Sequence, residues 1–186
     1  EELLDYAKEL GLKEMTFYAL SVENIKNRPI IELNYLYKVF KETFRDLNIK
    51  KIHENKIKIR FIGNLELLPK DLREQCEKLE QETKYNNKFT VNFAIAYGGR
   101  QEIIEVVKRI LKNKVNKNNF NIDDVDDKLI EKNLYLDSEP ELIIRTGGEK
   151  RTSNFLLWQA AYSEWIFLDK MWPEFSKEDL VNCINE

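Results

Sequence analysis

The sequence predicts an α/β fold, in which a mostly parallel β-sheet carries helices on its faces. Two observations support this class. Short apolar runs that are typical of buried strands alternate with longer segments whose apolar residues repeat at helical spacing. Several of the strand-like runs end in polar or glycine-rich loops, and the carboxyl ends of parallel strands are where such sheets bind ligands. The 186 residues fit a single domain, with no repeat or linker to divide them.

The first half of the chain alternates regularly. An amphipathic segment that stops at Gly11 predicts a first helix, because glycine favours the position just after a helix ends. The polar stretch 21–29 predicts a loop. The expected strands are 15–20, 56–62 and 89–97, and the expected helices are 30–48, 70–84 and 101–112.

The second half predicts two more strands, at 142–145 and 164–168, and a helix in the apolar segment that follows Ser153. A Lys- and Asn-rich stretch at 113–121 predicts a solvated loop. A short helix is expected over 122–134, and a last helix begins near its cap at Ser176. Core positions are the simplest interpretation of Trp158, Trp165 and Trp172.

Composition excludes several classes of protein. The net charge of −3 comes from 30 basic and 33 acidic residues that are interspersed, so the chain lacks the basic footprint of a nucleic-acid binder. Cys76 and Cys183 have no metal-site spacing and suggest a reduced, cytoplasmic protein. No apolar run is long enough to span a membrane. The only histidine, His53, lies in a charged segment, where a surface position is expected and no histidine triad can be built.

The stretch 141–168 carries the clearest chemical signal. A β-branched run ends at Arg145, and a Gly147-Gly148 loop follows with two more cations, Lys150 and Arg151, and with the hydroxyls of Thr152 and Ser153. Glycines let backbone N–H groups approach a ligand, and arginines bind phosphate oxygens bidentately. The pattern predicts a diphosphate-binding loop, and a solvated connection is the alternative.

Glu164 stands between Tyr162 and Trp165, at the start of an apolar run. An acid there is costly to bury unless it is paired or bound to a metal. An oxygen ligand for Mg²⁺ beside a phosphate site is one interpretation. A carboxylate at the exposed end of a strand is the other.

The loop 21–29 gains interest from its position after the first strand. Ser21, Glu23, Asn24 and Arg28 are its candidate ligand-binding residues. The alternative is that Asn24 or Asn27 simply caps the next helix, with Pro29 in its first turn. The glycine pair before Arg100 is open to two interpretations as well, a phosphate loop or a tight turn between strand and helix.

Four separated motifs occur along the chain in the order YALSVENIKNRP, NFAIAYGGR, RTGGEKRTSNFLLWQAAYSE and MWPEF. Together they resemble the cis-prenyltransferase family, the undecaprenyl diphosphate synthases. The resemblance implies repeated condensation of isopentenyl diphosphate onto an allylic diphosphate of the farnesyl type, with Mg²⁺, to make a long-chain polyprenyl diphosphate. It also implies a homodimer, peripheral membrane contact during product release, and a hydrophobic tunnel. Candidate lining residues are Leu33, Leu36, Val39 and Phe40, and ordinary core positions are the alternative for them.

The same resemblance assigns individual roles by motif. Arg145, Arg151, Thr152 and Ser153 match the residues that bind the diphosphate of isopentenyl diphosphate, and Glu164 matches a metal-associated glutamate. Ser21, Val22, Glu23 and Asn24 match a loop near the reacting carbons, where the asparagine helps to remove a proton. Arg28 matches less well, because the family usually has one residue fewer before its arginine, and Ile25 replaces a common aromatic residue.

The main departure concerns the two ends of the chain. The motif DGNGRWA, with its Mg²⁺-binding aspartate, belongs before Glu1, and an Arg-x-Gly tail belongs after Glu186. We therefore expect a single domain over 1–186 that lacks both, and an inactive polypeptide as written. A non-catalytic partner subunit of a heteromeric prenyltransferase and a dolichol-type synthase are the alternative functions.

Overall fold

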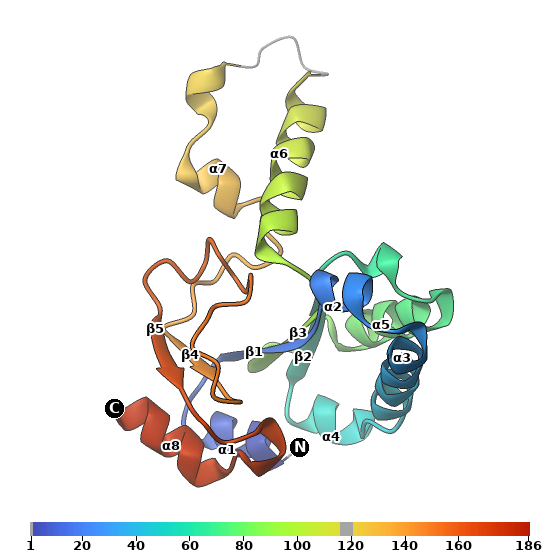
Figure 1. Cartoon of the computed structure of the whole chain (residues 1–186), viewed down its shortest axis with the longest axis vertical. Helices are drawn as coiled ribbons and strands as arrows, with labels where there is room; N and C mark the ends of the chain where they lie inside the picture. The colour runs from blue at the N-terminus through green and yellow to red at the C-terminus, as the bar shows by residue number, and fades with distance from the viewer. Residues whose placement is uncertain (1, 116–120) are drawn as a thin grey trace. The chain divides into compact units, whose positions relative to one another are not determined.

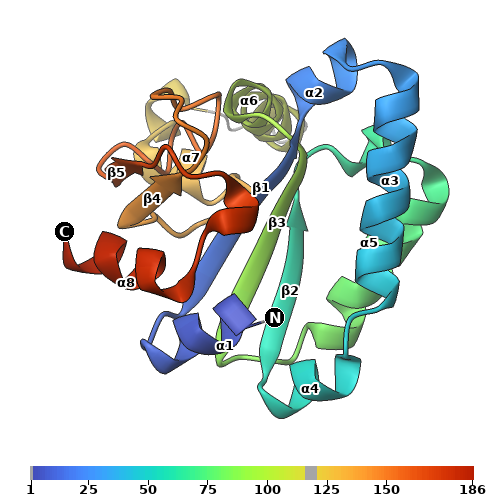
Figure 2. The ribbon, with the colours of Figure 1, turned by 60° about the horizontal axis from the view of Figure 1, so that its bottom comes forward.

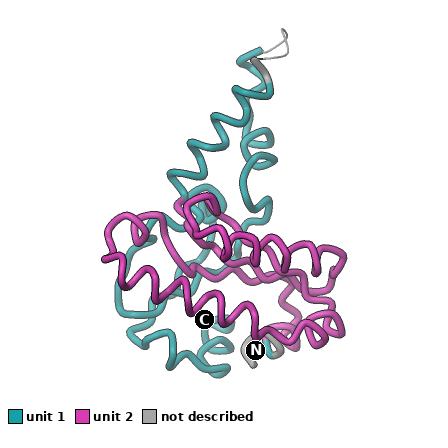
Figure 3. The backbone as a smooth tube through the Cα atoms, turned by 90° about the vertical axis from the view of Figure 1, so that its right-hand side faces the viewer, with its two compact units in different colours: residues 1–6, 99–186 teal, residues 7–98 magenta. Residues whose placement is uncertain are grey.

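The structure is a computed structural model that describes the backbone of residues 2–115 and 121–186 (Figure 1). Its chain forms two compact units. One contains Ala7–Gly98, and the other contains Glu1–Tyr6 with Gly99–Glu186 (Figure 3). None of the helices in the described ranges combines the length and the apolar composition that a membrane span needs.

The unit of residues 7–98 is built on a three-stranded parallel sheet. Strand β3 (Phe89–Tyr97) lies between β1 (Glu14–Ser21) and β2 (Ile57–Ile62), as Figure 2 shows. A central parallel strand is covered on both faces, so β3 reads as a nearly continuous apolar run and is mostly buried. All three strands end at the same edge, which brings the stretches after Ser21, Ile62 and Tyr97 to one side of this unit.

Helices α2 (Val22–Asn27), α3 (Ile30–Arg45), α4 (Ile49–Glu54) and α5 (Lys70–Thr83) complete the unit, with a 3₁₀ turn at Leu65–Leu67. Helix α5 packs on β2 and satisfies its backbone donors. The amide of Ile59 donates to Thr83 Oγ1 at 3.0 Å, and the amide of Phe61 donates to Glu80 Oε1 at 2.6 Å. Side chains of α5 therefore serve N–H groups of β2 that no strand partner uses.

A row of phenylalanines crosses the sheet on one face. The register pairs Phe93 with Phe17 on β1 and with Phe61 on β2, and the ring centroids lie 5.8 and 5.6 Å apart. Phe44 of α3 closes over Phe61 and Phe93 at 5.0 and 5.6 Å, and Phe40 stacks on Phe44 at 6.0 Å. We call these five residues the aromatic ladder. Phe61 and Phe44 are buried, whereas Phe17, Phe93 and Phe40 are only half-buried.

The other unit contains the long helix α6 (Gly99–Val115), the short helix α7 (Asp127–Glu131) and the C-terminal helix α8 (Lys177–Asn185). Strand β4 (Leu142–Arg145) pairs in parallel with β5 (Glu164–Phe167), and 3₁₀ turns occupy Ile122–Asp124 and Trp172–Glu174. Buried Glu102 of α6 joins distant segments, because its carboxylate accepts from the amide of Tyr135 at 2.6 Å and from Gln159 Nε2 at 3.2 Å.

The α/β class and the parallel pairing are confirmed, and the first helix, α1 (Glu2–Glu9), ends before Gly11 as expected. The strands nevertheless group into two sheets among the described residues rather than one. Other expectations were borne out at single residues. His53 is exposed, Cys76 and Cys183 are free buried thiols, and Ser176 caps the last helix.

Four predictions of secondary structure were wrong. Residues 22–27 are a helix, not a loop. The expected helix 30–48 stops at Arg45, and α4 begins after Asn48, whose side chain accepts from the amide of Lys51 at 3.1 Å. The expected helix 122–134 is a 3₁₀ turn followed by α7, which Asp126 caps. Residues 155–163 form turns, and Trp172 is 52% exposed rather than core.

Candidate functional site

The loop that follows β4 is the most highly charged candidate site. Gly147 and Gly148 adopt φ values of +93° and +73°, which glycine tolerates without strain. Their N–H groups point into the protein. The amide of Gly147 donates to the carbonyl of Lys170, and that of Gly148 donates to the carbonyl of Leu168, both at 2.9 Å. The expectation that these two N–H groups approach a ligand was therefore wrong, because the protein's own backbone uses them.

Arg145 fixes the shape of this loop. Its Nη1 donates to Ser153 Oγ at 2.6 Å and also to the carbonyl oxygen of Arg151. The guanidinium therefore joins the first residue of the loop to two residues six and eight positions later. Arg145 remains half-exposed, and its other N–H groups are still suited to phosphate oxygens.

The remaining polar side chains of the loop face outwards. Arg151 is 64% exposed and pairs with Glu149, with Nη1 and Oε2 3.0 Å apart. Lys150, Thr152 and Ser153 are exposed as well. The structure thus brings Arg145, Arg151, Thr152 and Ser153 together on one loop. Its cations can bind an anion of several charges, such as a diphosphate.

The segment after the loop explains why the expected helix is absent. Ser153, Asn154 and Leu156 all have positive φ values, of 49°, 62° and 43°. Non-glycine residues adopt such values only when the surroundings impose them. Asn154 shows what does so, because its carbonyl accepts from the amide of Gly99 at 2.7 Å and its Oδ1 accepts from that of Arg100 at 2.8 Å. The glycine pair before Arg100 is thus a tight turn.

Glu164 begins β5, and its carboxylate is exposed. The register pairs Glu164 with Leu142 and pairs Phe167 with Arg145, so Glu164 and the cationic loop lie at opposite ends of this two-stranded sheet. Three residues of strand correspond to about 10 Å. Within the described part of the chain, no three His, Cys, Asp or Glu side chains gather closely enough to hold a metal ion.

The second candidate site lies where β1 ends, in the unit of residues 7–98. Ser21 caps α2 through a reciprocal capping box. Its Oγ accepts from the amide of Asn24 at 3.0 Å, and Asn24 Oδ1 accepts from the amide of Ser21 at 3.4 Å. Neither Asn24 nor Asn27 begins the next helix, which starts after Pro29. The capping box explains why six residues expected to be a loop are helical.

The other residues predicted for this site differ in exposure. Val22 is buried, with 3% of its surface exposed, so only its backbone can meet a ligand. Glu23 and Asn24 are half-buried. Arg28 is exposed and pairs with Glu32 of α3 at 3.6 Å, which is a contact typical of a helix surface. Ser21, Glu23 and Asn24 therefore gather on one turn, and Arg28 lies beyond its end.

Tyr18 is a neighbour of this turn that sequence reasoning missed. Its hydroxyl donates to the carbonyl of Tyr97 at 3.3 Å, and the two rings meet edge to face at 5.8 Å. Burial and the negative charge of Glu23 raise the pKa of Tyr18 to about 12, although a hydrogen bond with Ser21 lowers it. The phenol stays neutral at physiological pH. A phenol inside an otherwise apolar strand was the available signal.

Comparisons with known proteins agree with one another over nearly the whole chain. A family model described as "Putative undecaprenyl diphosphate synthase" matches residues 1–186. The tritrans,polycis-undecaprenyl-diphosphate synthase (geranylgeranyl-diphosphate specific) of Pyrococcus abyssi is 43% identical, and the alignment covers 100% of this chain and 71% of that protein. The enzyme of the same name from Methanopyrus kandleri is 45% identical, over 100% of this chain and 69% of its own.

Two solved structures are similar to this one. The crystal structure of a "probable undecaprenyl diphosphate synthase" from Campylobacter jejuni has a TM-score of 0.88 and 30% identity, and the match covers 99% of this chain and 84% of that one. Lavandulyl diphosphate synthase from Lavandula x intermedia, solved with dimethylallyl diphosphate, has a TM-score of 0.91 and 31% identity, with coverages of 98% and 79%.

Proposed function

Since this chain belongs to the undecaprenyl diphosphate synthase family of prenyltransferases, we propose that it condenses isopentenyl diphosphate onto geranylgeranyl diphosphate and repeats the step to an undecaprenyl-length product. The primer differs from the farnesyl type expected from motifs alone. It is chosen because the archaeal relatives at 42–45% identity are geranylgeranyl-diphosphate specific. The names of those relatives share one activity, the synthesis of undecaprenyl diphosphate by cis-prenyl chain elongation, which is a transferase reaction.

The observation that carries the proposal is the cationic loop with Arg145, Arg151 and Ser153. In each condensation a carbon–carbon bond forms between C4 of isopentenyl diphosphate and C1 of the allylic diphosphate. The C1–O bond of the allylic substrate breaks and releases its diphosphate as pyrophosphate, and a proton is lost from C2 of the isopentenyl unit. The loop would hold the diphosphate of isopentenyl diphosphate, which is kept in the product, while Asn24 would assist removal of the proton. Holding both reactants in contact can lower the barrier by about 7–11 kcal/mol.

Among the residues predicted for the site, Glu164 has the chemistry of a Mg²⁺ ligand. Glu164 offers an exposed carboxylate, and Mg²⁺ in proteins is usually bound by one or two carboxylates together with substrate phosphates and water. When bound, the ion would neutralise charge on a diphosphate. We propose that Glu164 contributes to this site.

Replacing Glu164 by Gln keeps its size and removes its charge. We expect the Mg²⁺ concentration that gives half-maximal turnover to rise several-fold, because a carboxylate ligand for a hard cation is lost. A Glu139→Gln variant, at an exposed glutamate outside the loop, is the matched control. If both variants show the wild-type dependence on Mg²⁺, the role of Glu164 is refuted.

The aromatic ladder supports a binding surface for the isoprenoid chain. Phe17 and Phe93 stack across neighbouring strands, yet both are half-buried although β3 is the central strand of its sheet. Such a surface can bury the apolar tail of a growing product. Leu33, expected to line the tunnel, is buried, whereas Leu36, Val39 and Phe40 are half-buried.

We also propose that the protein is a homodimer. Ile104, Val107 and Leu111 of α6 share one face of the helix and are 52%, 46% and 46% exposed, which is unusual for three large apolar side chains in a stripe. A second copy of the chain would cover them. A Val107→Glu variant should then be smaller in solution than the wild type by light scattering, and an unchanged mass would exclude this face.

Turnover by the full-length protein tests the proposed function. It is incubated with isopentenyl diphosphate, Mg²⁺ and one allylic primer, and the products are separated by chain length. We expect geranylgeranyl diphosphate to be the best of geranylgeranyl, farnesyl and dimethylallyl diphosphates. If none of the three is elongated, the catalytic proposal fails and a non-catalytic partner subunit takes its place.

Peripheral membrane contact is tested in the same reactions by sedimentation with phospholipid vesicles before and after turnover.

A further inference from the structure

The cationic loop rests on a short segment that follows β5. The carbonyl groups of Leu168 and Lys170 accept the hydrogen bonds of Gly148 and Gly147, each at 2.9 Å. Between them, Asp169 lies so close to Gly148 that a Cβ added there would be 3.4 Å from Asp169 Oδ1. The position of residues 168–170 therefore determines where the two glycines lie, and with them the cations on either side.

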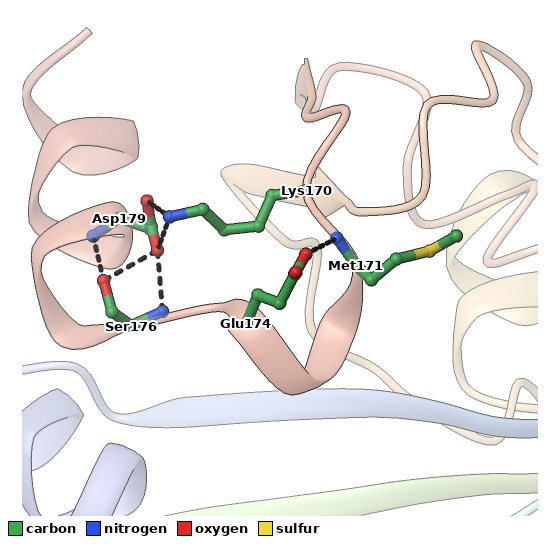
Figure 4. Close-up of polar contacts among 5 residues, drawn as sticks. All are labelled: Lys170, Met171, Glu174, Ser176 and Asp179. Carbon is green, nitrogen blue, oxygen red and sulfur yellow. Dashed lines mark hydrogen bonds and ion pairs between the residues drawn. The ribbon is translucent and has the colours of Figure 1, made fainter.

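Residues 168–170 are themselves held from the other side by α8 (Figure 4). Lys170 Nζ contacts both carboxylate oxygens of Asp179, at 2.7 and 2.8 Å. The same carboxylate accepts from the amide and from the hydroxyl of Ser176, both at 2.7 Å, while the amide of Asp179 donates back to Ser176 Oγ at 3.2 Å. Asp179 is thus fixed by the capping box of its helix as well as by Lys170.

Lys170 consequently links α8 to the cationic loop. Its side chain is bound to the start of α8, and its backbone carbonyl is bound to Gly147. Next along the chain, the amide of Met171 donates to Glu174 Oε2 at 3.0 Å, which holds the following 3₁₀ turn. An ion pair on a surface usually contributes little to stability. This one has two contacts, and Asp179 is only 18% exposed.

We propose that Lys170, through its pair with Asp179, is a positioning residue for the diphosphate-binding loop. It acts on isopentenyl diphosphate only through the loop, since its side chain faces α8. The inference rests on the proposed function in one respect, namely that the loop binds a diphosphate. A role in positioning predicts an effect on substrate affinity that a role in stability alone does not.

Two variants remove the pair in different ways. Lys170→Met removes the positive charge and keeps most of the length of the side chain. Asp179→Asn weakens the ion pair and leaves an oxygen that can still accept from Ser176. In each, we expect the KM for isopentenyl diphosphate to rise about 3- to 10-fold with kcat nearly unchanged, since binding common to ground and transition states is lost. The double variant should be no worse than either single one, because both remove the same interaction.

Controls separate positioning from a general loss of stability. Lys128→Met removes an exposed lysine of α7, in the same unit, and should leave KM unchanged. Lys170→Arg should restore most of the affinity, since arginine also binds a carboxylate with two contacts. Trypsin gives a measurement that does not depend on activity. Cleavage after Lys150 and Arg151 should be faster in Lys170→Met than in Lys128→Met when the loop loses its support.

The outcomes are distinguishable. If the wild type elongates no allylic primer, the proposed function fails first, and the trypsin comparison still tests the support of the loop. If the wild type is active while Lys170→Met and Asp179→Asn keep its KM and its cleavage rate, the inference is overturned. A lower melting temperature with unchanged KM also overturns it, because the pair would then stabilise α8 and nothing more.

Discussion

We propose that Arg145 combines two roles that its sequence context does not separate. Its guanidinium binds Ser153 Oγ and the carbonyl of Arg151 within the protein, and it retains N–H groups for a ligand. Arginine can do both because its five donors lie in a rigid plane, whereas lysine is a single flexible charge. The residue types of the loop are visible in the sequence, but the internal partners of Arg145 are not.

We expect Arg145→Ala to weaken binding of isopentenyl diphosphate by about 1.5–3 kcal/mol, the range for hydrogen bonds to charged groups. Arg145→Lys should be intermediate, because it keeps the charge but cannot make both internal contacts. Calorimetric titration of the two folded variants measures the difference. An affinity equal to that of the wild type in Arg145→Ala would exclude this residue from the site.

The lowered pKa of Asp179 predicts that the stability of the protein depends on pH in the acidic range. Its hydrogen bonds with Lys170 and with Ser176 lower its pKa from 3.8 to about 2. Because the folded-state pKa is depressed, the ionised carboxylate favours the folded state above pH 4 or so, and this contribution disappears as the pH falls towards 2. Melting temperatures of the wild type and of Asp179→Asn should therefore differ at pH 7 and converge near pH 2. A constant difference would show that charge is not the cause.

At the scale of elements, the glycines provide the sharpest comparison. Gly63 and Gly11 both have positive φ, at 130° and 80°. A Cβ at Gly11 meets nothing within 4 Å, whereas one at Gly63 would lie 2.1 Å from the carbonyl oxygen of Ile95. The same substitution thus tests backbone conformation alone at one site and a steric clash with β3 at the other.

Gly11→Ala should cost about 1–2 kcal/mol of unfolding free energy, the penalty for a left-handed residue with a side chain. Gly63→Ala should cost clearly more, because the backbone of β2 or β3 must move. Urea denaturation of both variants gives the two values on one scale. Equal values would mean that the backbone at Gly63 and Ile95 can move apart at no additional cost in free energy.

The elements that sequence reasoning placed correctly are those with a strong internal period. The run FTVNFAIAY predicts a buried strand, and the amphipathic segment 70–84 predicts α5, in agreement with the structure. The errors lie where a local cap or a distant contact decides. The Ser21–Asn24 capping box creates α2, and Asn154 holds the turn where an apolar run predicted a helix. The second kind of error arises because the partners of Asn154, Gly99 and Arg100, lie more than 50 residues earlier in the sequence.

For the whole molecule, charge is spread rather than concentrated. Lys38–Glu42, Lys50–Glu54, Lys70–Glu74 and Lys78–Glu82 are exposed pairs one helical turn apart. Each contributes about 0.3–0.5 kcal/mol and is screened by salt. The net charge of −3 adds little repulsion. The free energy of unfolding should therefore change little between low and high salt.

We expect that change to be at most about 2 kcal/mol when NaCl rises from about 0.05 M to about 0.5 M. Binding of inorganic pyrophosphate should weaken strongly over the same range, because the exposed cations of the loop are screened. Denaturation and titration at the two salt concentrations check both expectations. A large loss of stability would point to ion pairs more important than the exposed ones described above.

The fold class was predictable from the whole chain because alternation of strand and helix patterns is a property of the sequence at large. The family resemblance was predictable from four motifs and is confirmed over residues 1–186. The division into two compact units was not, since it depends on contacts between segments far apart in sequence. The orientation of Gly147 and Gly148 was equally hidden, because Leu168 and Lys170 lie some twenty residues further on.

The start of α6 has a consequence for the order of folding. A helix leaves its first N–H groups without partners, and here Asn154 provides two acceptors from 54 residues further along the chain. The middle of α6 can form early from local contacts, but its first turn is complete only after the segment with Asn154 has arrived. Substitutions at Asn154 should therefore accelerate unfolding more than they slow folding, as expected for a contact absent from the transition state. The cationic loop and the first turn of α6 would then be among the last parts of this unit to become native.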